Sequence, residues 1–134
     1  MKLESLTPNL MVKNVNESIN FYTSYLGFTL LQTVPENGDF EWGFVQKDNV
    51  HIMFQREDSI REEYPELEKQ LSGGALTFYI KITDLLKFYE KIKTSVKIVH
   101  NLHKTPYGAN EFSILDPDRF ILVFSDILKK KIRL

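Results

Sequence analysis

An internal repeat is the feature that most constrains how this sequence can fold. A constant shift of 70 residues lays the second half over the first and preserves the apolar alternation on both sides. Identical pairs under that shift include Thr7 and Thr77, Glu41 and Glu111, Asp48 and Asp118, and Phe54 and Phe124. Self-similarity at a fixed period indicates a structural unit that occurs more than once. The sequence therefore predicts one supersecondary unit made twice.

Hydrophobic periodicity predicts the same order of elements in both halves. In the first half we expect a strand at 6–12, a helix that starts after its cap Asn16 and is ended by Gly27, and strands at 28–34, 40–46 and 50–55. In the second half we expect a strand at 75–82, a helix at 84–93, a strand at 96–100, a long turn at 101–109 and a final hairpin at 110–124. The predicted class is α+β: two tandem βαβββ units that form a curled mixed sheet with an open cleft. Within one domain, 1–134, unit one spans 6–57, a connector helix 58–73, unit two 74–126 and a tail 127–134.

Local signals predict where the helices begin and end. Asn16 is the expected N-cap of the first helix, because its side chain can accept from a free first-turn N–H, and Gly27 is expected to end it. Ser59 and Glu62 have the spacing of a capping box at the start of the connector helix. Pro65 predicts a break, because proline is tolerated only in the first turn of a helix.

Composition removes several classes of function. The formal net charge of -1 offers no positive field for nucleic acid or an acidic membrane. The absence of cysteine excludes thiolate nucleophiles and cysteine metal ligands. We find neither a signal peptide nor an apolar run long enough to cross a bilayer, which requires about 18 residues. These features predict a soluble cytoplasmic protein without nucleic-acid or membrane partners.

Alternation along the strands predicts which side chains line the cleft. The expected cleft face consists of Thr7, Asn9, Met11, His51, Met53, Gln55, Thr77, Tyr79, Lys81, Ile121, Val123 and Ser125, with Glu41 and Glu111 from a neighbouring strand. Trp42 and Phe44 either join Tyr79 and Tyr107 in an aromatic wall or lie in the core under the first helix. His100 and His103 are expected on surface loops.

Two segments at opposite ends of the repeat resemble the signatures of a known superfamily. "LTPNLMVKNVNESINFYTSYLGF" resembles the opening and "TPYGANEFSILDPDRFILVF" the closing signature of the vicinal oxygen chelate proteins. That superfamily includes glyoxalase I, bleomycin-resistance proteins, fosfomycin-resistance enzymes and extradiol dioxygenases. The resemblance spans roughly residues 6–126 and implies the glyoxalase/bleomycin resistance fold. Arg119 stands where glycine is usual, which predicts a less tight turn.

The resemblance also implies positions for a divalent metal in the enzymes of the superfamily. Carried over, these positions are Thr7, Met53, Thr77 and Val123, where the enzymes have His, Gln or Glu. Two hydroxyls, a thioether and a valine are a poor ligand set for such a metal. The sequence therefore resembles the metal-free, bleomycin-resistance-like branch. Such relatives bind an organic molecule without a cofactor and usually form homodimers.

These observations leave more than one function open. The first is capture of a small organic molecule in a metal-free cleft, with antibiotic sequestration as one form. The alternative is a metal-dependent lyase or dioxygenase with a non-standard site, for which Glu41, His51 and Glu111 are candidate ligands, so enzymatic activity stays undecided. A third is a dimerising domain with a vestigial cleft. The predicted cleft residues are Met11, Glu41, Trp42, His51, Met53, Thr77, Tyr79, Tyr107, Glu111 and Val123.

Overall fold

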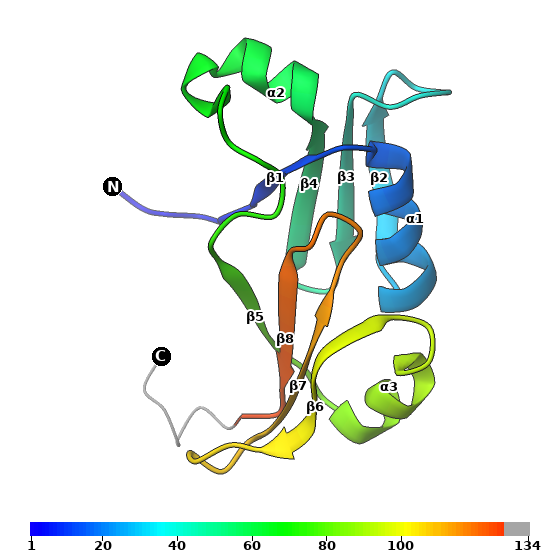
Figure 1. Ribbon diagram of the computed structural model, residues 1–134, viewed down its shortest axis with the longest axis vertical. Coiled ribbons are helices and arrows are strands. Elements are labelled where there is room, and N and C mark those ends of the chain that lie inside the picture. The colour runs from blue at the N-terminus through cyan, green and yellow to red at the C-terminus, as the bar shows by residue number, and fades with distance from the viewer. Residues whose placement is uncertain (128–134) are drawn as a thin grey trace. The chain divides into compact units, whose positions relative to one another are not determined.

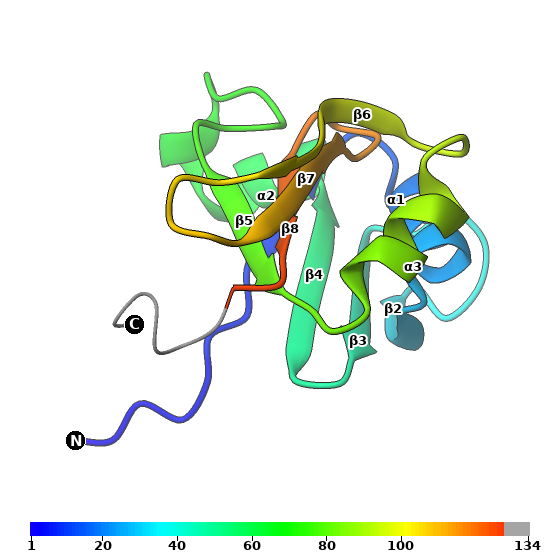
Figure 2. The same cartoon turned by 90° about the horizontal axis from the view of Figure 1, so that it is seen from below.

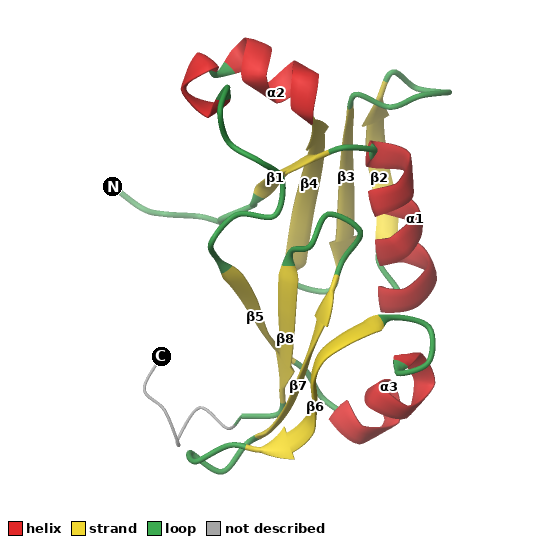
Figure 3. Ribbon diagram, in the orientation of Figure 1, coloured by secondary structure: helices red, strands yellow, loops and turns green. Residues whose placement is uncertain are grey.

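The chain folds into two compact units, each built on its own sheet (Figures 1 and 3). A computed structural model describes residues 1–127, so the predicted tail beyond residue 127 lies outside the described residues. The first unit is Met1–Gly74 and the second begins at Ala75. Among the described residues, no helix is both long and apolar enough to cross a membrane.

The first unit has the predicted βαβββ order followed by a short connector (Figure 1). Its elements are β1 (Asn9–Val12), α1 (Val15–Leu26), β2 (Thr29–Val34), β3 (Trp42–Lys47), β4 (Val50–Arg56), α2 (Glu57–Glu63) and the 3-10 helix η1 (Pro65–Leu67). The strands lie in the order β1-β4-β3-β2. β1 runs parallel to β4, and the other neighbours are antiparallel. The predicted break at Pro65 is confirmed, because α2 ends before it and η1 begins at it.

The second unit repeats this arrangement. Its elements are β5 (Thr77–Lys81), α3 (Leu85–Ile92), β6 (Lys97–Lys104), β7 (Asn110–Leu115) and β8 (Ile121–Ser125). The strand order is β5-β8-β7-β6, with β5 parallel to β8. The α+β class and the repeated βαβββ unit are therefore confirmed. One prediction was wrong: β6 continues through residues 101–104, which were expected to be a turn, because it stays paired with β7 through two register shifts. His100 and His103 consequently lie on this strand, both exposed.

Each helix covers one face of the sheet in its own unit (Figures 1 and 2). In the first unit, the fully buried Tyr22 of α1 contacts Phe28 and Phe54, with ring centroids 5.6 and 4.9 Å apart. In the second, fully buried Phe112 is surrounded by the rings of α3 and β8. The faces of β4 and β8 opposite the predicted cleft residues thus form the cores, although Val50, at the start of β4, is only half-buried.

The start of α1 differs from the prediction by two residues. Asn14, not Asn16, is the N-cap, and its Oδ1 accepts a hydrogen bond from Glu17 N at 3.0 Å. Asn16 instead ties the loop before β3 to the helix: its Nδ2 donates to Gly38 O at 2.8 Å and its Oδ1 accepts from Phe40 N at 2.9 Å. Both asparagines use side-chain hydrogen bonds to backbone groups, but only Asn14 has the extended backbone of a cap.

The predicted capping box at the connector is also wrong. α2 begins directly after β4, with Arg56 as the N-cap, so Ser59 lies inside the helix. This frees the Ser59 hydroxyl to bond with side chains of the sheet. That change matters for the site described below.

The turn before β8 keeps its tight form despite Arg119. Arg119 has a φ of 70°, the left-handed conformation that glycine takes most easily, so the predicted loosening does not occur. The Asp116 carboxylate organises the turn by accepting hydrogen bonds from Asp118 N and Phe120 N, each at 2.9 Å. These bonds hold the arginine backbone in a conformation that a non-glycine residue adopts at a cost.

Strand register corrects the alignment of the two repeats on one strand. In the first unit Trp42 pairs with Gln55, whereas in the second Glu111 pairs with Ser125. The equivalent strand pairs Gln46–His51 and Leu115–Ile121 enclose connections of different length. Residues 116–120 connect the second pair and residues 47–50 the first, so the connection before β8 is one residue longer. The structural counterpart of Glu111 is therefore Trp42 and not Glu41, and the shift is 69 on this strand but 70 on β5 and β8.

Gly43 permits α1 to approach β3 closely. A Cβ added at Gly43 would lie 2.6 Å from Ile19 Cδ1 and 3.3 Å from Val15 Cγ1. Gly43 and Val45 are both buried, so this face of β3 lies against the helix. Trp42 and Phe44 therefore point to the opposite face of the sheet.

We expect Gly43→Ala to lower the free energy of unfolding by about 1–3 kcal/mol, because the added methyl group overpacks the contact with α1. The opposite sign would follow if the space were open, since glycine-to-alanine changes generally stabilise by restricting the unfolded chain. Ile19→Val removes the clashing Cδ1 and serves as the partner in a double-mutant cycle measured by urea unfolding. Additive effects of the two changes would contradict this packing argument.

Candidate functional site

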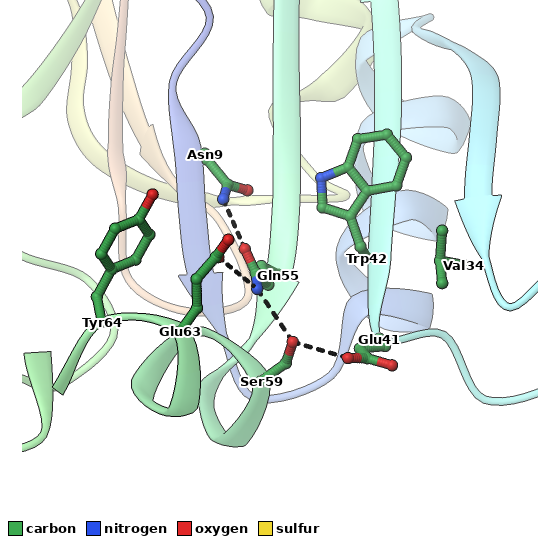
Figure 4. A pocket seen from close by; sticks show the side chains of 8 residues that line it. All are labelled: Asn9, Val34, Glu41, Trp42, Gln55, Ser59, Glu63 and Tyr64. Atoms are coloured by element: carbon green, nitrogen blue, oxygen red, sulfur yellow. Dashed lines mark hydrogen bonds between the residues drawn. The ribbon is translucent and has the colours of Figure 1, made fainter.

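A pocket opens on the face of the first sheet opposite α1 (Figure 4). It has a volume of about 340 Å³, within the range of small-molecule sites. The lining residues are Asn9, Val34, Glu41, Trp42, Gln55, Ser59, Glu63 and Tyr64. All of them belong to the first unit, and they come from β1 to β4, the residue before β3, α2 and the C-cap of α2.

The pairing of β3 with β4 supplies the aromatic part of this face. Trp42 lies opposite Gln55, and Phe44 lies opposite Met53 on the same side. The rings of Trp42 and Phe44 are 6.0 Å apart, and those of Phe44 and His51 are 5.8 Å apart. Both aromatic residues of β3 are half-buried, which settles the alternative left by the sequence in favour of the open face.

A chain of hydrogen bonds joins the sheet to α2 at the pocket (Figure 4). Asn9 Nδ2 donates to Gln55 Oε1 at 2.8 Å. Gln55 Nε2 donates to Ser59 Oγ at 3.0 Å and to Glu63 Oε1 at 3.2 Å. Ser59 Oγ in turn donates to Glu41 Oε1 at 2.9 Å. Buried Gln55 thereby fixes the positions of side chains from β1 and α2.

The charge of the pocket is negative. Glu41 and Glu63 are its only ionisable lining residues apart from Tyr64. Each glutamate accepts one hydrogen bond from the network described above, through its Oε1 atom. Arg56 follows Gln55 on β4, but its guanidinium pairs with Asp58 at 2.6 Å and Asp39 at 3.7 Å. The lining thus contains two carboxylates, one indole ring and no cation.

A second polar cluster lies in the second unit, around Glu111. This side chain is only 6% exposed, and its Oε2 accepts hydrogen bonds from the hydroxyls of Tyr79 and Tyr107, each at 2.5 Å. Ser125 Oγ lies 2.9 Å from the Tyr79 hydroxyl. Burial, the largest effect, raises the pKa of Glu111, but hydrogen bonds from Tyr107, Tyr79 and Ser125 and the electrostatic effect of His103 together outweigh it, so the pKa lies below its ordinary value. The carboxylate raises the pKa of Tyr107, whose phenol stays protonated.

The structure distributes the predicted cleft residues unequally. Glu41 and Trp42 line the pocket of the first unit, and Tyr79, Tyr107 and Glu111 meet in the cluster of the second. Five other predicted residues lie outside both groups: Met11, His51, Met53, Thr77 and Val123.

Sequence reasoning missed four pocket residues: Val34, Ser59, Glu63 and Tyr64. Ser59 and Glu63 are four residues apart, on one face of a helix, and that spacing was the available signal. The capping-box interpretation concealed it by placing Ser59 at a helix start.

The carried-over metal positions do not fit a divalent ion. Threonine hydroxyls and a methionine thioether are weak neutral donors, and Val123 has no donor atom. Within either unit of the described chain, no three His, Asp or Glu side chains form a possible metal group.

The alternative ligand set is not brought together within the first unit. Arg56 N donates to Glu41 O at 2.9 Å, so Glu41 lies beside the end of β4. His51 is five residues earlier on that strand, roughly 16 Å away at about 3.3 Å per residue. Metal–ligand bonds of about 2 Å cannot span that separation.

Comparisons with solved structures show where this fold occurs elsewhere. A protein of unknown function from Agrobacterium tumefaciens str. C58 matches with a TM-score of 0.78 and 19% identity, over 96% of this chain and 97% of that one. TioX from Micromonospora sp. ML1 matches with a TM-score of 0.74 and 17% identity, over 93% and 99% of the two chains. A glyoxalase/bleomycin resistance protein/dioxygenase family enzyme from Burkholderia phytofirmans PsJN matches with a TM-score of 0.74 and 14% identity, over 91% and 97%. At these identities the likeness shows the fold alone.

Sequence comparison identifies the family. No curated protein is similar enough in sequence to be matched. The model of the Glyoxalase/Bleomycin resistance protein/Dioxygenase superfamily, in contrast, matches residues 3–124, which is most of the chain and includes both repeats. Together with the two βαβββ units, this match shows that the chain belongs to the glyoxalase/bleomycin resistance protein/dioxygenase superfamily.

Proposed function

We propose that this protein binds a small amphipathic organic molecule carrying an amine, in a metal-free pocket of its first unit. Such binding would include the sequestration of an antibiotic. The observation that carries it is the pocket itself, which Trp42 lines together with the carboxylates of Glu41 and Glu63. Its volume of about 340 Å³ suits a ligand of modest size or one end of a larger molecule.

The chemistry of the lining supports this ligand class. An indole ring attracts a cation through its negative face, and two carboxylates add direct charge attraction. The Asn9–Gln55–Ser59 network holds both carboxylates in place before a ligand arrives. Side chains that are already ordered lose less conformational entropy on binding.

The alternative of a metal-dependent lyase or dioxygenase has less support. The carried-over positions lack suitable donors, and Glu41 and His51 lie too far apart to share an ion. The proposed function therefore includes no metal-dependent reaction. Homodimer formation and a cytoplasmic location stay predictions.

The test compares amphipathic amines with neutral and anionic analogues of the same apolar body. We expect phenethylamine and cationic glycopeptide antibiotics to raise the melting temperature and change Trp42 fluorescence, whereas phenethyl alcohol and phenylacetate have little effect. A ligand at 100 times its Kd stabilises by about 2.7 kcal/mol. Prior dialysis against EDTA should leave these responses unchanged. Loss of the response after EDTA, with recovery on adding a divalent metal, would contradict a metal-free pocket.

A further inference from the structure

The helix α2 forms one wall of the pocket in the first unit. Ser59 and Glu63 belong to this helix, Tyr64 is its C-cap, and all three line the pocket. If α2 left the sheet, the pocket would lose these side chains and, with Glu63, one of its two carboxylates. The attachment of α2 to the sheet therefore decides whether the pocket has the form described above.

α2 has few contacts that could hold it in place by themselves. Within this fully described helix of seven residues, Ile60 is the one buried side chain and no side chain caps the N-terminus. Isolated helices shorter than about 12 residues are marginal in water, so α2 depends on its attachment to the rest of the fold. Arg61 bonds to Glu57 within the helix and to the Gln70 carbonyl in the segment that follows, and neither contact reaches the sheet. Segments with so little buried apolar surface open locally at low free energy.

The side chain of Gln55, on β4, links the sheet to this helix (Figure 4). Its Oε1 accepts from Asn9 at 2.8 Å, and its Nε2, which carries two hydrogens, donates to Ser59 at 3.0 Å and to Glu63 at 3.2 Å. The orientation of this amide is determined by its neighbours, because the reversed amide would turn its oxygen toward the Glu63 carboxylate. Gln55 is 9% exposed, so a lost hydrogen bond here is not freely replaced by water.

We infer that α2 is a movable wall of the pocket and that the Gln55 amide is the latch that holds this wall against the sheet. Gln55 is thus a positioning residue, which acts on a ligand through Ser59 and Glu63. A ligand that needs Glu63 binds the latched state and therefore shifts the population of α2 toward the sheet. This consequence for binding rests on the proposed function, whereas the latch can be tested without a ligand.

The experiment follows hydrogen exchange at the backbone amides of residues 60–64, which reports how often α2 opens. In the full chain, Gln55→Glu keeps the size of the side chain but replaces both N–H donors with an oxygen that faces the Glu63 carboxylate. We expect exchange at these amides to become at least about tenfold faster, because a hydrogen bond to a charged group is lost. Gln46→Glu on β3 adds the same charge outside the pocket lining and should leave α2 unchanged. Unchanged protection of α1 shows in each variant that the unit is folded.

Two further variants separate a latch from a general loss of stability. In Gln55→Glu with Glu63→Gln, the amide at position 63 can donate to the carboxylate at position 55, so exchange should return to within about threefold of the wild type. Ser59→Ala raises the intrinsic helix propensity but removes the hydroxyl that bonds to Gln55 and Glu41, so exchange should still become severalfold faster. Slower exchange in Ser59→Ala, unchanged exchange in Gln55→Glu, or no recovery in the double variant would each overturn the latch.

Phenethylamine separates the latch from the proposed function. At 100 times its Kd, it should slow exchange at residues 60–64 of the wild-type chain by at least about tenfold, because it binds the latched state. Binding of phenethylamine without slower exchange would overturn the movable wall and leave the proposed function intact. If the variants follow the expected pattern but phenethylamine does not bind the wild-type chain, the proposed function is wrong and the latch stands.

Discussion

Phe112→Ala is expected to lower the free energy of unfolding by about 3–5 kcal/mol, the largest stability effect we predict. Phe112 is fully buried, and its ring lies 4.9 Å from that of Tyr89, 5.3 Å from Phe124 and 6.0 Å from Phe88. Removing it takes away the transfer free energy of the ring and leaves a cavity between α3 and the sheet that these neighbours cannot fill. Urea unfolding followed by circular dichroism measures the loss.

Leu86→Ala is the matched control for Phe112→Ala. Leu86 lies on the same helix as Tyr89 but is 58% exposed. Its truncation should cost less than about 1 kcal/mol, because little apolar surface leaves water there on folding. Comparable losses for the two variants would mean that the core of the second unit is not centred on Phe112.

The double change Glu41→Gln with Glu63→Gln is expected to weaken binding of an amine ligand by about 100-fold, the largest functional effect we predict. Each charge-assisted contact to a carboxylate is taken as about tenfold in affinity, or about 1.4 kcal/mol. Glutamine still offers an oxygen to Ser59 or to Gln55, so the network that shapes the pocket should persist. Isothermal titration with phenethylamine measures the change.

The control for that pair is Glu17→Gln with Glu62→Gln, which alters net charge equally without touching the pocket lining. It should change affinity less than about twofold. Binding of phenethyl alcohol should be nearly unaffected in both double variants, since it has no charge to pair. If the pocket variant binds the amine as tightly as the wild type does, the two glutamates are not its counter-charges and the proposed ligand class is wrong.

The overall fold could be predicted because its signals are local or periodic. Alternation along β4 and β8 identified their buried faces, Gly27 ended α1 in the left-handed conformation, and the repeat indicated that one unit occurs twice. Each of these signals rests on a backbone preference or on the two-residue period of a strand. These signals can therefore be interpreted without knowing which elements lie next to them in the fold.

The site depended on relations between elements that no local signal carries. A single additional residue before β8 changed the counterpart of Glu111 from Glu41 to Trp42. The lack of a cap at Ser59 brought that residue and Glu63 to the pocket, and Asn14 took the cap expected of Asn16. Each of these polar side chains could form hydrogen bonds with several groups close to it in sequence. The sequence does not show which of those partners it binds in the folded protein.

The sequence by itself determined the element order and the buried faces, because a duplicated pattern of apolar periodicity admits few folds. Its opening and closing motifs, by their resemblance to known signatures, indicated the superfamily. Only the tertiary structure decided which polar side chains meet: the chain from Asn9 through Gln55 and Ser59 to Glu41, and the convergence of two tyrosines on Glu111. The physical reason is register. A shift of one residue in strand pairing moves a side chain to the other face of the sheet while leaving the hydrophobic content of the segment unchanged.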